Sequence, residues 1–152
     1  MGEHIGFIGL GNIGKPIADN IARGGYTLSV YDLAGTKERA PMGSFVASSV
    51  SQVAERANIV FLCLPSLSSM STVVAEICKA NCQDDAVVVN TSTAGPTAAR
   101  AAYDQLSRKG IRYADAPISG SVARAGEAQL AVMFSGEEGL FERLEPVLKT
   151  FG

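Results

Sequence analysis

The chain has 152 residues, of which 47% are hydrophobic and 18% are charged, with a formal net charge of -2 at pH 7. This composition suits one globular domain and excludes a disordered chain. The small net charge gives no electrostatic reason to expect nucleic acid or an anionic membrane as a partner, and the longest apolar stretch, Ile59 to Pro65, is far short of the roughly 20 residues of a membrane span.

The N-terminus and the cysteines indicate the compartment. The opening Met1-Gly2-Glu3-His4 is acidic where a signal peptide is basic, and Gly6 stands where a myristoylation motif needs Ser or Thr. Three cysteines are an odd number and form no disulfide framework, which favours a reducing compartment. We expect a cytoplasmic protein, or a protein of an organelle matrix if a transit peptide was removed.

Strands and helices alternate in the first half of the chain. A short apolar run at 4–8 predicts a strand, and Ile13, Ile17 and Ile21 recur at helical spacing up to Gly24-Gly25. The elements expected next are a strand at 26–31, a short helix or loop at 34–42, a weak strand at 44–47, a helix at 50–57 capped by Ser48 or Ser49, and a strand at 59–64.

The same alternation continues to the C-terminus. The expected elements are a helix at 68–80, a strand at 86–89, a helix at 96–109, a strand at 112–116, a short helix or loop, a strand at 129–134 and a helix at 138–150. Such alternation implies right-handed crossovers and a parallel sheet. The predicted fold class is α/β, a Rossmann-type doubly wound, mostly parallel sheet with helices on both faces, formed by residues 1–152 as one domain.

The segment Gly9-Leu10-Gly11-Asn12-Ile13-Gly14 matches the pattern G-x-G-x-x-G. It directly follows the first predicted strand and opens the first predicted helix, as a dinucleotide-binding turn does. The first glycine permits the tight turn, the second lets the backbone approach a pyrophosphate, and the third lets helix and strand pack closely. The free amides around Asn12 and Ile13 are expected to donate to phosphate oxygens. The alternative is a glycine-rich turn with purely structural duties.

Asp32 ends the second strand, 18 residues after Gly14. A carboxylate there is expected to accept hydrogen bonds from the adenosine ribose and to repel a 2′-phosphate, which favours NAD over NADP. Lys37 and Arg39 lie close enough in sequence to allow NADP binding as well. The alternative role for Asp32 is that of an ordinary turn or cap residue.

The run from Gly6 to Asn20 resembles the N-terminal signature of the β-hydroxyacid dehydrogenases, a family that includes 3-hydroxyisobutyrate dehydrogenase, tartronate semialdehyde reductase and, more distantly, 6-phosphogluconate dehydrogenase. The family usually has Met where Ile13 and Ile17 stand, which is a conservative exchange. The resemblance implies an NAD(P)-binding domain followed by an all-helical domain, in a protein that forms homo-oligomers.

Further segments agree with the family in order and spacing. Leu64-Pro65 resembles the loop beside the cofactor, and Thr91-Ser92-Thr93 resembles the turn near the nicotinamide ribose. The resemblance implies cofactor contacts at Leu64, Pro65, Ser69 and Thr93. The segment from Asp115 to Ser121, with Gly126 after it, resembles the substrate motif, so that Ser119, Gly120 and Ser121 are implied to bind a substrate carboxylate. Ser121 replaces the usual second glycine of the family.

No residue of this chain is expected to be the proton donor. In the family a lysine has this role, and we expect it beyond Gly152. The five lysines of the chain, which are predicted to be solvated, are Lys15, Lys37, Lys79, Lys109 and Lys149. His4 is expected to be structural, Cys63 to lie inside a buried strand, and Cys78 with Cys82 to form no metal site.

The leading hypothesis is therefore the cofactor domain of an NAD-preferring dehydrogenase that acts on a small 3-hydroxyacid or its semialdehyde, similar to 3-hydroxyisobutyrate. Without the lysine, the domain by itself is expected to bind cofactor and not to turn over. One alternative is a non-catalytic module for NAD binding or protein interaction. A related imine reductase is another alternative, against which the motif from Asp115 to Gly120 argues.

Overall fold

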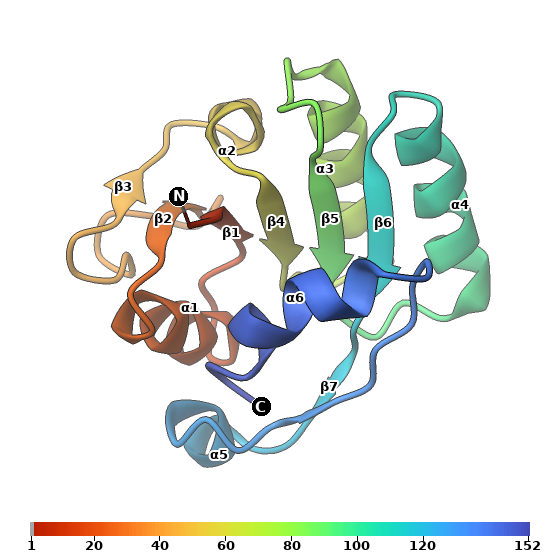
Figure 1. Ribbon diagram of the computed structural model, residues 1–152. Helices are drawn as coiled ribbons and strands as arrows, with labels where there is room; N and C mark the ends of the chain where they lie inside the picture. The colour runs from red at the N-terminus through yellow and green to blue at the C-terminus, as the bar shows by residue number, and fades with distance from the viewer. Residues whose placement is uncertain (1) are drawn as a thin grey trace.

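Six parallel strands form the central sheet of the computed structural model, which describes residues 2–152. In chain order they are β1 (His4–Ile8), β2 (Thr27–Tyr31), β3 (Phe45–Val46), β4 (Ile59–Leu62), β5 (Val87–Asn90) and β6 (Arg112–Asp115). Their spatial order is β3-β2-β1-β4-β5-β6, so the chain winds outward from β1 in both directions (Figure 1). The predicted doubly wound parallel sheet is confirmed, with its switch point between β1 and β4.

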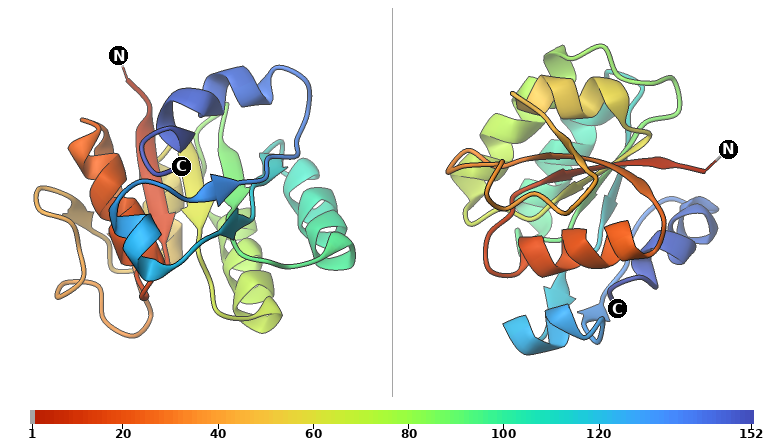
Figure 2. Two further views of the ribbon diagram at one scale, coloured as in Figure 1. Left: turned by 90° about the horizontal axis from the view of Figure 1, so that it is seen from below. Right: turned by 90° about the vertical axis from the view of Figure 1, so that its left-hand side faces the viewer.

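Helices cover both faces of this sheet (Figures 1 and 2). One face carries α1 (Gly14–Arg23) and α6 (Leu140–Leu148), and the other carries α2 (Val50–Arg56), α3 (Leu67–Lys79) and α4 (Pro96–Ser107). Each of the predicted long helices is present, and the observed ends differ from the predicted ones by at most two residues, as helix boundaries usually do.

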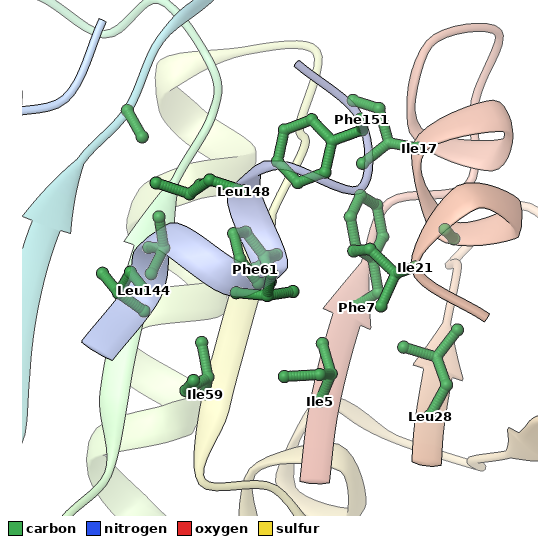
Figure 3. Close-up of a cluster of buried hydrophobic side chains, with 14 of the residues drawn as sticks. Ile5, Phe7, Ile17, Ile21, Leu28, Ile59, Phe61, Leu144, Leu148 and Phe151 are labelled. Atoms are coloured by element: carbon green, nitrogen blue, oxygen red, sulfur yellow. The ribbon is translucent and has the colours of Figure 1, made fainter. Parts of the chain in front are cut away.

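The strands are apolar at consecutive positions because both of their faces are buried. Phe7 of β1 and Phe61 of β4 stack at 6.1 Å between ring centroids on the face of α1 and α6, and Phe151 meets Phe61 edge-on at 5.9 Å (Figure 3). The neighbouring Val60 and Leu62 belong to the second core, under α2, α3 and α4. Alternate residues of one strand therefore supply two separate cores.

Serine and proline residues fix the helix starts. The Ser49 hydroxyl accepts from the backbone N–H of Gln52 and caps α2, which decides between the two serines considered from the sequence. Ser66 caps α3 in a reciprocal capping box with Ser69. Pro96 occupies the first turn of α4, where its missing N–H costs nothing.

After β6 the chain leaves the sheet and forms a small separate layer. β7 (Ile118–Ser119) pairs antiparallel with β8 (Ala131–Val132), and α5 (Val122–Gly126) lies between them in sequence. The amide of Asn20 on α1 donates to the carbonyl of Ala125 at 2.7 Å, which anchors α5 beside α1. Strand β7 was not predicted, and the strand predicted at 129–134 is reduced to two residues.

One prediction about local structure needs correction. The strand predicted at 59–64 ends at Leu62, so Cys63 lies just beyond it and is only partly buried against the core of the α1 face. Burial still raises the pKa of the Cys63 thiol. Between β2 and β3, where a short helix or loop was predicted, the chain forms a loop of turns, because Pro41 and two positive-φ glycines interrupt any helix. Within residues 2–152, none of the helices combines the length and the hydrophobicity needed to cross a membrane.

Candidate functional site

The candidate site residues gather at the carboxyl edge of the sheet, beyond the arrowheads of the strands (Figure 1). Parallel strands all end at this edge, so loops that are far apart in sequence meet there. His4 begins β1 at the opposite edge, where its Nε2 lies 2.8 Å from the hydroxyl of Ser29. His4 is thus remote from the candidate site, as expected.

Gly9 and Gly14 are required by the fold itself. Gly9 has a φ of 104°, and a Cβ at this position would overlap the carbonyl oxygen of Cys63 after β4. A Cβ on Gly14 would overlap the carbonyl oxygen of Gly9 across the turn. Both positions therefore exclude a side chain, because another part of the backbone lies too close. At Gly9 the positive φ is a second reason.

Gly11 differs from the other two glycines. A Cβ on Gly11 would meet no atom within 4 Å, and its φ is not positive. Gly11 and Asn12 are exposed, and within residues 2–152 the N–H groups of Asn12 and Ile13 donate no hydrogen bond. The turn thus presents an open backbone cradle with free donors at the N-terminus of α1, which is the arrangement that binds an anion such as a pyrophosphate. The residues present fit a dinucleotide.

The Asp32 carboxylate lies beside this turn and is largely buried, with 12% of its side chain exposed. Its Oδ2 accepts from the N–H of Leu10 at 2.6 Å, and its Oδ1 accepts from the N–H of Ala34 at 2.7 Å. The guanidinium of Arg39 also approaches Oδ1, at 3.4 Å. The carboxylate therefore has the turn-stabilising role that was considered as the alternative. Its contact with a ribose remains a prediction.

The loop after β4 comes next along the edge. The N–H of Leu64 donates to the hydroxyl of Ser92 at 2.7 Å, which connects this loop to the end of β5. Pro65 is exposed at the tip. The Ser69 hydroxyl donates to the carbonyl of Ser66, 2.9 Å away, and accepts from its N–H, so it is engaged in the capping box. A cofactor contact of Ser69 remains a prediction.

The turn after β5 places Thr93 at the surface of the site. Thr91 is buried and donates to the carbonyl of Leu62 at 2.7 Å, whereas Thr93 is exposed. Thr93 borders an open cavity of about 930 Å³ that extends along α4. None of the residues from Gly9 to Gly14 lines this cavity, so it neighbours the predicted dinucleotide groove without coinciding with it.

A polar network supports the ends of β5 and β6. Asp115 accepts from the hydroxyl of Tyr113 at 2.9 Å and from the amide of Asn90 at 3.4 Å. Burial, together with the Asp115 charge, raises the pKa of Tyr113, so its hydroxyl stays protonated and donates. Asn90 is fully buried and also donates to the carbonyl of Ser92 at 3.1 Å. This network fixes the strand ends from which the Thr93 and Ser119 loops depart.

The predicted substrate loop follows in β7 and the turn after it. Ser119 and Gly120 are exposed, and within residues 2–152 the Ser119 hydroxyl makes no hydrogen bond. Gly120 has a φ of 149°, and a Cβ there would lie 2.7 Å from Leu130. The Ser121 hydroxyl accepts from the N–H of Arg124 and caps α5. Ser121, which stands where the resembled family has a second glycine, is thus a helix cap. A contact of Ser121 with substrate remains a prediction.

The lysines of residues 2–152 are paired with carboxylates, lie far from this edge or, in the case of Lys37, are exposed in the loop that follows Asp32. Lys15 on α1 pairs with Asp19 at 2.9 Å, and Lys149 pairs with Glu145 at 2.9 Å. Lys79 and Lys109 border a cavity at the other end of the sheet, and Lys37 is exposed in the loop after β2.

Three contributing residues were not predicted from the sequence. Asn90 is a polar residue at the end of an apolar strand, and this pattern alone was a usable signal. Thr36 is buried and bonds both the N–H and the carbonyl of Asp32, at 2.9 and 3.0 Å. Tyr113 looks like an ordinary strand residue in the sequence, and nothing there indicates its hydrogen bond to Asp115.

Comparison with known proteins agrees with this geometry. Residues 4–152 match the family model of the NAD-binding domain of 6-phosphogluconate dehydrogenase. The chain is 34% identical to 2-(hydroxymethyl)glutarate dehydrogenase of Eubacterium barkeri and 30% identical to mitochondrial 3-hydroxyisobutyrate dehydrogenase of Drosophila melanogaster, with 97% and 99% of the chain covered. It spans about half the length of these relatives, 50% and 47% respectively.

Solved structures of related enzymes have a similar fold. The Mycobacterium tuberculosis 3-hydroxyisobutyrate dehydrogenase with L-serine has a TM-score of 0.93 at 28% identity, and it covers 100% of this chain and 53% of its own. An imine reductase of Myxococcus stipitatus in complex with NAD+ shares the fold, with a TM-score of 0.89 at 24% identity over 100% of this chain and 53% of its own. The chain belongs to the 6-phosphogluconate dehydrogenase-like group of NAD-binding domains, within the β-hydroxyacid dehydrogenase family.

Proposed function

We propose that this chain is the cofactor-binding part of a longer NAD(H)-dependent oxidoreductase that acts on a small 3-hydroxyacid or its semialdehyde, of the 3-hydroxyisobutyrate kind. The observation that carries the proposal is the open cradle at Gly11, where the fold leaves room for a side chain and the neighbouring amides lack acceptors within residues 2–152. The residues proposed to hold the cofactor are Gly9, Leu10, Gly11, Asn12, Ile13, Gly14, Asp32, Leu64, Pro65, Ser69 and Thr93.

When bound, the nicotinamide ring supplies or accepts a hydride. The chain's own residues bind and orient the reactants. The amides of Asn12 and Ile13 donate to the pyrophosphate, and Asp32 accepts from the ribose. Ser119 donates its free hydroxyl to the substrate carboxylate, and the exposed backbone of Gly120 approaches the same group.

We propose that the proton for the carbonyl oxygen comes from a lysine outside residues 1–152, in a segment leading into an all-helical domain. In support, the ammonium groups of Lys15 and Lys149 are paired with carboxylates, and two other lysines lie at the far end of the sheet. A positioned proton donor contributes about 10² to 10⁴ in rate, so the isolated chain is expected to bind cofactor without turnover.

Calorimetric titration of the chain with NAD, followed by assay of the full-length protein for NADH oxidation with small semialdehyde acids, tests the proposal. We expect binding by the chain and turnover by the full-length protein alone. Absence of NAD binding would overturn the cofactor site, and turnover by the isolated chain would overturn the external lysine. Full-length protein that binds NAD and reduces none of these substrates would favour a non-catalytic module, and reduction of cyclic imines would favour an imine reductase.

A further inference from the structure

The loop after β2 is folded back onto Asp32. The Thr36 hydroxyl accepts from the N–H of Asp32 and donates to its carbonyl, and the N–H groups of Arg39 and Ala40 donate to the carbonyl of Thr36 at 3.1 and 2.9 Å. Thr36 is only 9% exposed. These bonds form a compact turn and fix the position from which the Arg39 side chain extends.

The turn places the Arg39 guanidinium against the carboxylate of Asp32. The distance from its Nη1 to Oδ1 of Asp32 is 3.4 Å, and the Arg39 side chain is 41% exposed whereas that of Asp32 is 12% exposed. The Asp32 charge is therefore held in place by backbone amides, and its counter-ion stays accessible from solvent. A half-exposed arginine has the freedom to reorient toward a bound anion.

This pairing changes the electrostatics of the adenosine end of the site. An unpaired carboxylate repels a 2′-phosphate and so rejects NADP, whereas an arginine close to it binds that phosphate. We propose that Arg39 makes this site accept NADP(H) as well as NAD(H), by neutralising Asp32 and by donating to the 2′-phosphate. The inference rests on the proposed cofactor site and adds to it the residue that sets the cofactor range.

Other side chains of the loop are less suited to this role. Leu33, the residue directly after Asp32, is 91% exposed and carries no charge. Lys37 is exposed, and within residues 2–152 it forms no ion pair. Arg39 is the cation that the fold directs at Asp32, and its planar guanidinium suits bidentate binding of a phosphate.

Titration calorimetry of the chain with NAD and with NADP tests the inference through the ratio of the two dissociation constants. Loss of a charge-assisted contact to phosphate in Arg39→Ala is expected to raise the ratio Kd(NADP)/Kd(NAD) about tenfold. NAD binding itself is expected to tighten slightly, because Oδ1 of Asp32 loses a competing donor. Arg39→Lys keeps the charge and is expected to retain part of the NADP affinity.

Lys37→Ala is the matched control, since it removes the same charge from the same loop without touching Asp32. A rise of the ratio by about threefold or more in Arg39→Ala, not matched by Lys37→Ala, supports the inference. A smaller change, an equal loss for both cofactors, or an equal effect of Lys37→Ala overturns it. If the wild-type chain binds neither cofactor, the proposed function itself has failed.

Discussion

The backbone N–H of Leu10 donates to Oδ2 of Asp32 at 2.6 Å, so the carboxylate proposed to bind the adenosine ribose also holds the glycine turn in place. Leu10 is 1% exposed, and water cannot easily replace this acceptor. Cofactor recognition and the shape of the phosphate-binding turn are therefore connected through one side chain. A substitution chosen to test cofactor preference at Asp32 also acts on the fold.

Asp32→Ala is accordingly expected to destabilise the chain in the absence of any cofactor. A buried N–H left without its acceptor costs about 1–3 kcal/mol, and the Ala34 N–H loses its acceptor as well. Urea unfolding measures the change. Asp32→Asn keeps one acceptor oxygen for Leu10 and is expected to recover part of the stability while it still weakens NAD binding. An unchanged unfolding midpoint in Asp32→Ala would contradict the structural role.

The glycines of the turn separate into two classes that experiment can distinguish. Gly11→Ala adds a methyl group where the chain has open space, so the unfolding free energy is expected to change by about 1 kcal/mol or less. Its NAD affinity is expected to fall, because the methyl group occupies the space through which the pyrophosphate approaches the backbone. Thermal unfolding and calorimetry on the same sample give both quantities.

Gly14→Ala is the matched comparison. Its methyl group would overlap the carbonyl oxygen of Gly9, so we expect a loss of about 2 kcal/mol or more before any cofactor is added. If Gly11→Ala were as unstable as Gly14→Ala, the conclusion that Gly11 faces open space would be wrong. If it bound NAD as tightly as the wild type, the dinucleotide would not pass over this residue.

Ser119 and Ser121 are also expected to differ, one substitution affecting substrate binding and the other affecting stability. Ser121→Ala removes the cap of α5, and loss of such a cap costs about 0.5–2 kcal/mol of stability. Ser119→Ala removes an exposed hydroxyl that has no partner within residues 2–152, so stability is expected to hold while KM for the hydroxyacid rises in the full-length protein. Equal KM values for Ser119→Ala and the wild type would remove Ser119 from the substrate site.

The strands and long helices could be predicted because each one carries a pattern of its own. Continuous apolar runs such as 59–62 indicated strands buried on both faces, and the glycine turn identified its own place between β1 and α1. Strand β7 was missed because Ile118-Ser119 is too short to show any periodicity, and its partner β8 follows only after helix α5. The strand predicted at 59–64 was two residues too long because residue type alone does not mark where hydrogen-bond pairing ends.

The contacts within the candidate site were harder to predict. The sequence pointed to Asp32 and to Ser119, yet the bond from Leu10 to Asp32 and the ion pair with Arg39 depend on how a turn of non-periodic sequence folds. Ser69 completes the capping box of α3 and Ser121 caps α5, and neither role was predicted, because a serine that caps a helix and a serine that binds a ligand look alike in sequence. Three-dimensional partners were needed to separate them.

His4 supplies a prediction about pH and stability. Burial, and to a smaller extent the charge of Arg56, lower the pKa of His4 from its ordinary value of 6.5. Between the lowered pKa and 6.5 the unfolded chain binds more protons than the folded chain, so stability falls with falling pH across this window and is fully present above it. Protonation also places a positive charge near Arg56, which donates to the same Ser29 hydroxyl at 3.3 Å.

Urea unfolding of the wild type and of His4→Gln, from about pH 8 to pH 5, isolates this effect, because the carboxylates titrate alike in both proteins and cancel in the difference. The stability of the wild type relative to His4→Gln is expected to be constant above the ordinary histidine pKa and to decline below it. A difference that stays constant across the range would show that His4 titrates alike in the folded and unfolded chains. An increase at acid pH would reverse the assigned direction and would require a carboxylate beside His4, whereas the structure places Arg56 and Ser29 there.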